Sequence, residues 1–99
     1  MPIFMVDRIL PGITKEQLAG AQKKAIETSQ QFTAQSKPVR FIRSMFIPDE
    51  AHCMCLFEAP NAERVREVNE AAKLPFTRIV AAQDLTPVAT MAAGNPRLI

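Results

Sequence analysis

Hydrophobic and polar residues alternate along some parts of the chain and recur at helical spacing along others. Residues 2–10, 39–47, 51–59 and 78–85 carry alternating or continuous apolar runs, which are typical of β-strands. The stretches that follow the first and the third of these runs place apolar or small residues three and four positions apart, which predicts helices with one buried side. The pattern therefore predicts the element order β-α-β-β-α-β.

Both predicted helices carry recognisable signals at their ends. Thr14 is a good N-cap for the first helix, and Gln17, three residues further on, can return a hydrogen bond to the backbone of the cap. Asn61 is suited to cap the second helix. Leu74 and Pro75 are expected to end that helix, because a proline ring disfavours helical geometry in the preceding residue.

The element order is the split βαβ arrangement of a ferredoxin-like α+β sandwich, with an antiparallel sheet and both helices on one face. The central hairpin is largely apolar on both faces, and two helices can cover only one of them. We therefore expect a homodimer in which the uncovered faces pack together, as in a dimeric α/β barrel. Residues 1–86 are expected to form this domain, and residues 87–99 an extended C-terminal tail.

A hairpin loop at residues 48–50 fixes a testable strand register, in which Ile47 pairs with Ala51. This register places Arg40 opposite Glu58, as a cross-strand ion pair. It also places Arg43 on an apolar face with Phe41, Phe57 and the two cysteines. A guanidinium in that position must be paired or directed at an anionic group, unless it extends to the rim of the sheet.

Two cysteines, Cys53 and Cys55, are separated by one residue and should point to the same face of a strand. Their separation along the strand is too large for a relaxed disulfide. They are either small buried thiols or ligands for a soft metal ion. Since His52 is the only histidine, one chain cannot build a standard zinc site.

Composition narrows the classes of function. The chain has 99 residues, enough for one domain, and its 12 Lys and Arg against 10 Asp and Glu give a net charge of +2 without a basic block. Trp and Tyr are absent, so neither charge nor aromatic stacking indicates nucleic-acid binding. The first residues contain no basic leader or long apolar run, so we expect no signal peptide, no membrane span and a cytoplasmic location.

Four segments, residues 6–14, 55–63, 65–72 and 74–79, resemble a small ferredoxin-like nickel-binding family, most of which is classed as a domain of unknown function. The resemblance covers roughly residues 2–86, and the run Cys-Leu-Phe-Glu-Ala-Pro at 55–60 is its most specific part. It implies a dimeric ferredoxin-like fold and, for some members, binding of a transition metal such as nickel. Cys55 and Glu58 are the metal ligands that it suggests here, with help from Asp7.

The sequence departs from this family at two positions. Several members carry one histidine in the first strand and another in the second helix, where this chain has Arg8 and Asn69. A guanidinium stays protonated and a carboxamide oxygen is a weak ligand, so neither replaces imidazole on nickel.

Three functional hypotheses follow. The first is a metal-binding protein that uses Cys55 and Glu58. The second is a cofactor-free binding protein or enzyme, such as an isomerase, cyclase or oxygenase, in which Arg43, Asn69, Asp7 and Arg8 hold a small anionic or carbonyl ligand between sheet and helices. The third is a structural or regulatory dimer without a ligand.

Overall fold

The computed structural model describes residues 1–88 and confirms the predicted order of elements. The elements are β1 (Ile3–Ile9), α1 (Lys15–Ala34), β2 (Arg40–Ile47), a 3₁₀ turn (Pro48–Glu50), β3 (His52–Glu58), α2 (Ala62–Ala71) and β4 (Arg78–Ala82). Residues 89–99, which make up most of the predicted tail 87–99, lie outside the described residues.

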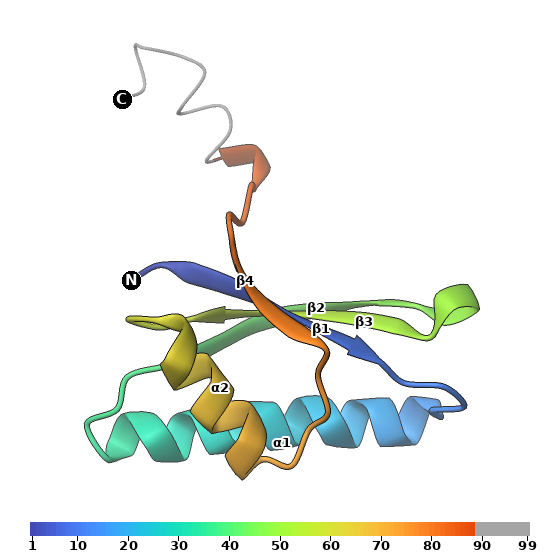
Figure 1. The fold of residues 1–99 in the computed structure, drawn as a ribbon, viewed down its shortest axis with the longest axis horizontal. Coiled ribbons are helices and arrows are strands. Elements are labelled where there is room, and N and C mark those ends of the chain that lie inside the picture. Colours follow the sequence, from blue (N-terminus) through green and yellow to red (C-terminus); the bar gives the residue numbers. More distant parts are fainter. Residues whose placement is uncertain (89–99) are drawn as a thin grey trace.

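The four strands form one sheet in the order β2-β3-β1-β4, and every neighbouring pair is antiparallel. Both helices lie on the same side of this sheet, as Figure 1 shows. These features confirm the α+β class and the ferredoxin-like topology. We call the face that packs on the helices the inner face, and the opposite face the outer face.

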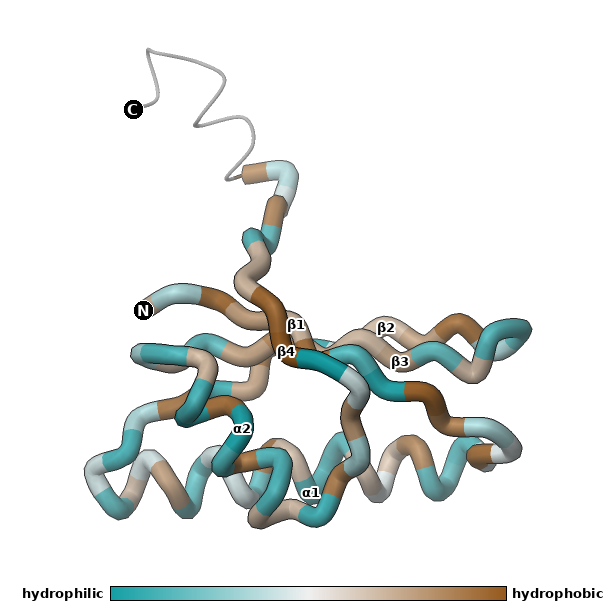
Figure 2. The backbone as a smooth tube through the Cα atoms, in the orientation of Figure 1, coloured by the Kyte–Doolittle hydropathy of each residue, from teal (hydrophilic) through white to brown (hydrophobic). Residues whose placement is uncertain are grey.

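The core lies between the inner face and the two helices. Phe57 and Val6 from the sheet and Val65 and Val68 from α2 are fully buried. The helices contribute narrow apolar stripes, so that hydrophilic and apolar segments alternate along them in Figure 2. None of the helices within residues 1–88 is both long enough and apolar enough to cross a membrane.

The β2–β3 hairpin corrects the predicted register. Arg40 pairs with Glu58 and Phe41 with Phe57, as predicted, but Arg43 then pairs with Leu56. A β-bulge at Ile42 therefore shifts every later residue of β2 by one position.

The shift reverses the face of each later side chain, because residues alternate along a strand. Ile47 pairs with His52 and not with Ala51, and Ala51 instead closes the turn in the left-handed conformation, with φ of 50°. The prediction that Arg43 lies among apolar residues on the cysteine face was therefore wrong. Ser44, which pairs with Cys55, takes that place on the inner face.

The first helix begins with the predicted capping box. Thr14 Oγ1 accepts a hydrogen bond from the backbone N–H of Gln17 at 3.1 Å, and Gln17 Oε1 accepts one from the backbone N–H of Thr14 at 2.9 Å. Two backbone donors at the open end of α1 are thereby satisfied.

Replacing Thr14 by alanine should lower the free energy of unfolding by about 1 kcal/mol, because the N-cap acceptor is lost. Thr14→Ser keeps the hydroxyl and should stay within a few tenths of a kcal/mol of the parent chain. Urea denaturation of the three proteins measures the difference. Equal destabilisation by both substitutions would contradict a role for the hydroxyl.

Candidate functional site

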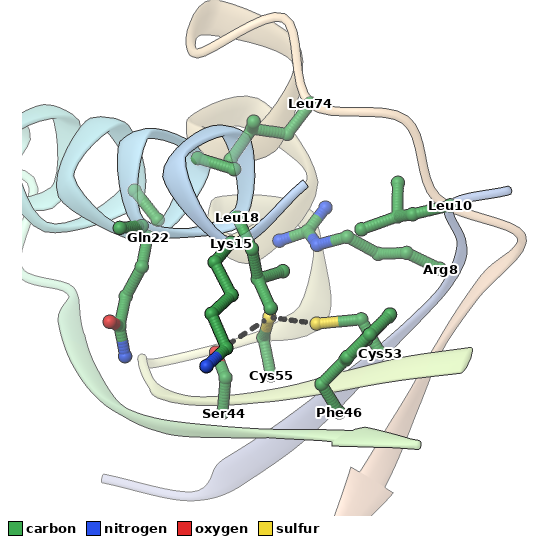
Figure 3. Close-up of a pocket in the computed structure, with 13 residues that line it drawn as sticks. Arg8, Leu10, Lys15, Leu18, Gln22, Ser44, Phe46, Cys53, Cys55 and Leu74 are labelled. Carbon is green, nitrogen blue, oxygen red and sulfur yellow. Dashed lines mark hydrogen bonds between the residues drawn. The ribbon is translucent and has the colours of Figure 1, made fainter. Parts of the chain in front are cut away.

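A cavity of about 380 Å³ lies between the first half of α1 and the inner face of the sheet. Apolar side chains of leucine, alanine and phenylalanine form most of its wall. The polar groups that line it are Arg8, Lys15, Gln22, Ser44, Cys53 and Cys55. In Figure 3, Lys15 and Gln22 extend from α1 toward the strands, and the two thiols face them. A mostly apolar pocket with a few convergent polar groups is the usual form of a small-molecule site.

The two thiols lie side by side at the base of this cavity. Both belong to β3 and are buried, and their sulfur atoms are 3.7 Å apart, so the cysteines are free as expected. The hydroxyl of Ser44 donates a hydrogen bond to Cys55 Sγ at 3.0 Å. This contact depends on the bulge in β2, which turns Ser44 to the inner face.

The pKa values of the two thiols shift in opposite directions. The hydrogen bond from Cys53 lowers the pKa of Cys55, with further help from the charge of Arg8 and from Ser44, while burial opposes the shift. The same hydrogen bond, together with burial, raises the pKa of Cys53. These shifts favour a thiolate on Cys55 that accepts a hydrogen bond from the thiol of Cys53.

Arg8 supplies the buried positive charge of the site. It lies on β1 beside the cysteines and is only 3% exposed. Its guanidinium donates to the backbone oxygen of Pro75 at 3.1 Å and to Asn69 Oδ1 at 2.6 Å. Both acceptors are neutral, and no carboxylate within residues 1–88 forms an ion pair with Arg8 in the structure. The charge of Arg8 helps to lower the pKa of Cys55, and a thiolate there would supply the counter-charge that a buried guanidinium requires.

Asn69 holds Arg8 in place from the helix side. It is fully buried on α2, and its amide nitrogen donates to the backbone oxygen of Val65 at 2.8 Å, which leaves Oδ1 directed at Arg8. The two positions at which this sequence departs from its apparent family therefore contact each other. The guanidinium of Arg8 is the donor and the amide oxygen of Asn69 is the neutral acceptor, and neither side chain is suited to bind nickel.

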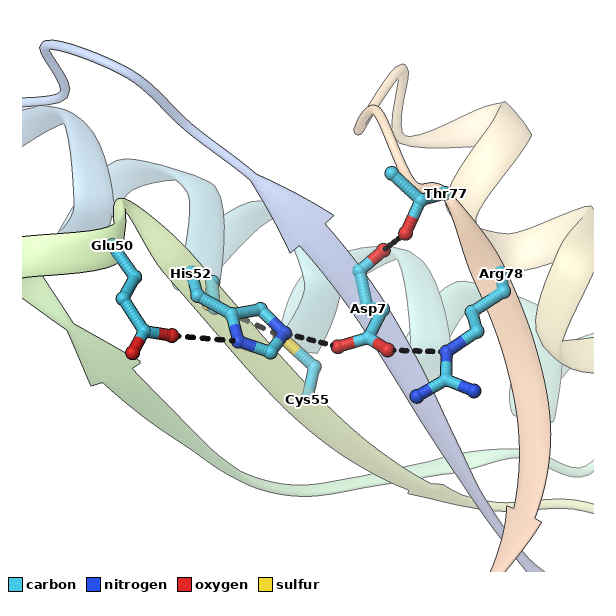
Figure 4. Close-up of polar contacts among 7 residues, drawn as sticks. Asp7, Glu50, His52, Cys55, Thr77 and Arg78 are labelled. Carbon is cyan, nitrogen blue, oxygen red and sulfur yellow. Dashed lines mark hydrogen bonds and ion pairs between the residues drawn. The ribbon is translucent and has the colours of Figure 1, made fainter.

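A second polar cluster lies on the outer face and is shown in Figure 4. Asp7, 5% exposed, accepts from Arg78 Nε at 2.5 Å and contacts His52 Nε2, while His52 Nδ1 lies 3.8 Å from Glu50 Oε1. The hydrogen bond with His52 and the contact with Arg78 hold the pKa of Asp7 below its ordinary value, although burial opposes them. Asp7 is therefore a paired carboxylate separated from the cavity by the sheet.

The other predicted site residues also lie away from the cavity. Arg43 is exposed on the outer face and forms an ion pair with Asp84. Glu58 pairs with Arg40 at 3.4 Å and, being three residues from Cys55 along β3, faces the opposite side of the sheet. The structure thus brings together Arg8, Asn69 and Cys55, but not Asp7, Arg43 or Glu58.

Sequence reasoning missed three residues of the cavity. The predicted register, in which Ile47 pairs with Ala51, puts Ser44 opposite Met54 and therefore on the wrong face, because the bulge has no strong signal in the run Arg-Phe-Ile-Arg-Ser. Lys15 and Gln22 were not among the predicted site residues. Their spacing of seven residues, two helical turns, places them on one side of α1 and could have suggested a shared surface.

The fold and cavity define a ferredoxin-like α+β protein with a pocket lined by thiols and an arginine. The family described as nickel responsive protein SCO4226-like matches residues 4–81, and this chain belongs to that family. The crystal structure of SCO4226 from Streptomyces coelicolor A3(2) is similar, with a TM-score of 0.71 and 27% sequence identity over 85% of this chain and 99% of that chain. No match was found among curated proteins.

At neutral pH, one thiolate per chain should be detectable by its ultraviolet absorbance under reducing conditions. Ser44→Ala should raise the pKa of Cys55, because a donor to the thiolate is lost, whereas Ser29→Ala on α1 should leave that pKa unchanged. The folded-state pKa of Cys55 lies below its ordinary value of 9.0, so its contribution to stability should increase as pH rises toward that value. Absence of thiolate absorbance at neutral pH would contradict this description.

Proposed function

We propose that this protein binds a thiophilic transition-metal ion, such as nickel, through Cys53 and Cys55 in the cavity beneath α1. The observation that carries the proposal is the distance of 3.7 Å between the two sulfur atoms, which face the same cavity. For tetrahedral zinc, metal–sulfur bonds of about 2.3 Å place two thiolates about 3.8 Å apart. The pair therefore needs little rearrangement to hold one ion.

The sulfur atoms of Cys53 and Cys55 could supply part of the coordination shell of a metal ion. Two thiolates supply two positions of a four-coordinate ion, and no group of three or more His, Cys, Asp or Glu side chains suited to a metal lies together within residues 1–88. A bound ion would supply a centre with open coordination positions facing the cavity. The family description as nickel responsive supports a metal, while thiolate donors also favour copper(I) and zinc.

Metal binding would take away the counter-charge of Arg8. Once both thiols are deprotonated, their two negative charges balance a divalent ion, and Arg8 keeps only its neutral acceptors, Asn69 and the backbone of Pro75. Loss of the proton from Cys53 makes metal binding release a proton, so affinity should increase with pH.

Equilibrium dialysis with nickel, copper(I) and zinc, under anaerobic reducing conditions, tests the proposal. We expect about one ion per chain, with binding abolished in Cys53→Ser and in Cys55→Ser. Glu58→Gln is the matched control, since Glu58 lies on the outer face and should not affect affinity. Less than half an ion per chain for all three metals, or loss of binding in Glu58→Gln alone, would rule out this site.

A second candidate function is binding of a small anionic or carbonyl compound in the same cavity without a metal. The specific observation is that Arg8 and Lys15 line the cavity, whereas no acidic residue of the described part of the chain does. In this case Arg8, with Asn69 behind it, would orient the anion or polarise the carbonyl. Native mass spectrometry of protein purified without added metal would reveal a bound organic molecule.

We also propose that the outer face forms a homodimer. Its apolar residues include Met5, Met54, Leu56 and Val80, which lie on three neighbouring strands and are not covered by either helix. Packing of two such faces would remove this surface from water. A cytoplasmic location remains a prediction, and a reducing compartment would keep the two free thiols available for metal.

Replacing Met5 by glutamate should convert the dimer to a monomer, because a charge would be buried in the contact. Ile26→Glu, at a 36% exposed position of α1, is the control and should leave the dimer intact. Multi-angle light scattering measures the mass of each protein, and circular dichroism verifies the fold. A monomeric parent chain, or a dimeric Met5→Glu variant, would exclude the outer face as the interface.

A further inference from the structure

The cavity beneath α1 is lined by positive side chains that lack acidic partners. Arg8 and Lys15 both line it, and no acidic residue within residues 1–88 does. Neither of them forms an ion pair with a carboxylate in the described part of the chain. Arg8 is 3% exposed, whereas Lys15, at the start of α1, is in contact with solvent. The charge of the cavity therefore favours a negatively charged ligand.

The guanidinium of Arg8 can bind an anion without losing its present contacts. Its hydrogen bonds to the backbone oxygen of Pro75 and to Asn69 Oδ1 use only part of its N–H donors, and they fix its orientation. An anion beside Arg8 would replace Cys55 as the counter-charge, because two negative charges next to one guanidinium repel each other. The buried cation is thus both held in position and able to pair with a ligand.

The remaining polar groups favour a carboxylate over a phosphate. Apart from the two cations and the thiols, the lining offers only the amide of Gln22, which extends from α1 toward the strands in Figure 3, and the hydroxyl of Ser44, which already donates to Cys55. A phosphate presents more charge and more accepting oxygen atoms than a carboxylate. Phosphate sites commonly use successive backbone N–H groups, as in glycine-rich loops, and no glycine lines this cavity. The few donors present match a single carboxylate.

The rest of the wall favours an apolar body on the ligand. Leu18 of α1 and Phe46 of β2 line the cavity together with Leu10 and Leu74. The volume is about 380 Å³, which at about 30 Å³ for each water-sized group leaves room for roughly ten non-hydrogen atoms. One aromatic ring or one branched alkyl chain with a carboxylate has this size. An apolar wall with a few polar groups at fixed positions is suited to such a molecule.

We infer that the cavity binds a small monocarboxylate with a compact apolar body, such as an aromatic or branched-chain acid. Its carboxylate pairs with Arg8, and its apolar part contacts the leucine and phenylalanine side chains of the wall. Lys15, which is exposed, adds to the attraction of the anion. This inference rests on the second candidate function above, names the class of ligand for it, and requires no metal ion.

Titration calorimetry with sodium benzoate tests this inference on the full chain, freed of metal on a chelating resin. We expect about one benzoate per chain. Benzamide has nearly the same shape without the charge and should bind about tenfold more weakly, because a hydrogen bond to a charged group contributes more than one to a neutral group. Acetate keeps the charge but lacks the ring, so it should also bind at least about tenfold more weakly.

Variants and nuclear magnetic resonance locate the bound benzoate. Arg8→Met keeps a long apolar side chain without the charge and should abolish binding, and Lys15→Gln should weaken binding several-fold. Lys24→Gln, on the same helix but outside the cavity lining, is the matched control and should bind like the parent chain. Circular dichroism verifies the fold of each variant. In the parent chain, nuclear Overhauser contacts from the ring of benzoate to Leu18 and Phe46 should be observed, which tests the location without any substitution.

The possible outcomes separate this inference from the function on which it rests. Equal affinity for benzamide and benzoate would overturn the monocarboxylate and leave a site for carbonyl compounds. Tighter binding of phenyl phosphate than of benzoate would overturn the carboxylate class and leave an anion site. Absence of binding by every probe, together with no co-purifying organic molecule in native mass spectrometry, would overturn both the inference and the second candidate function.

Discussion

The structure depends on how it accommodates the buried positive charge of Arg8. A guanidinium that is 3% exposed requires hydrogen bonds and a counter-charge, and it obtains them from three different elements. Asn69 joins it to α2, the backbone of Pro75 joins it to the segment before β4, and the cysteine pair of β3 supplies negative charge. One side chain thereby links β1 to α2 and contributes to the lowered pKa of Cys55 at the base of the cavity.

Much of the fold could be predicted because its signals are local. The strand and helix periods gave the order of elements, and the caps at Thr14 and Asn61 gave the start of both helices. The site could not be predicted to the same degree, because it depends on the face to which each side chain points. A single unpaired residue, Ile42, exchanged the positions of Arg43 and Ser44, so an expected buried cation became a surface ion pair. Such a bulge is set by tertiary pairing and not by local preference.

The two faces of the sheet carry different chemistry. Adjacent residues of β1, Asp7 and Arg8, point to opposite sides, and each is nearly buried among its own partners. On the outer face, Asp7 is neutralised by Arg78 and contacts His52, which makes it a closed polar cluster. On the inner face, Arg8 has neutral acceptors and a thiolate beside an open volume. The proposed ligand site therefore lies on the inner side, and the proposed contact between proteins on the outer side.

The bulge at Ile42 also changes how the sheet ends. In the order β2-β3-β1-β4, strand β2 is an edge, and a long regular edge offers a row of free backbone groups to which a strand of another molecule can add. An unpaired residue interrupts that row and increases the local twist, so the edge no longer matches a straight incoming strand. The bulge that places Ser44 beside the thiols should therefore also disfavour edge-to-edge aggregation.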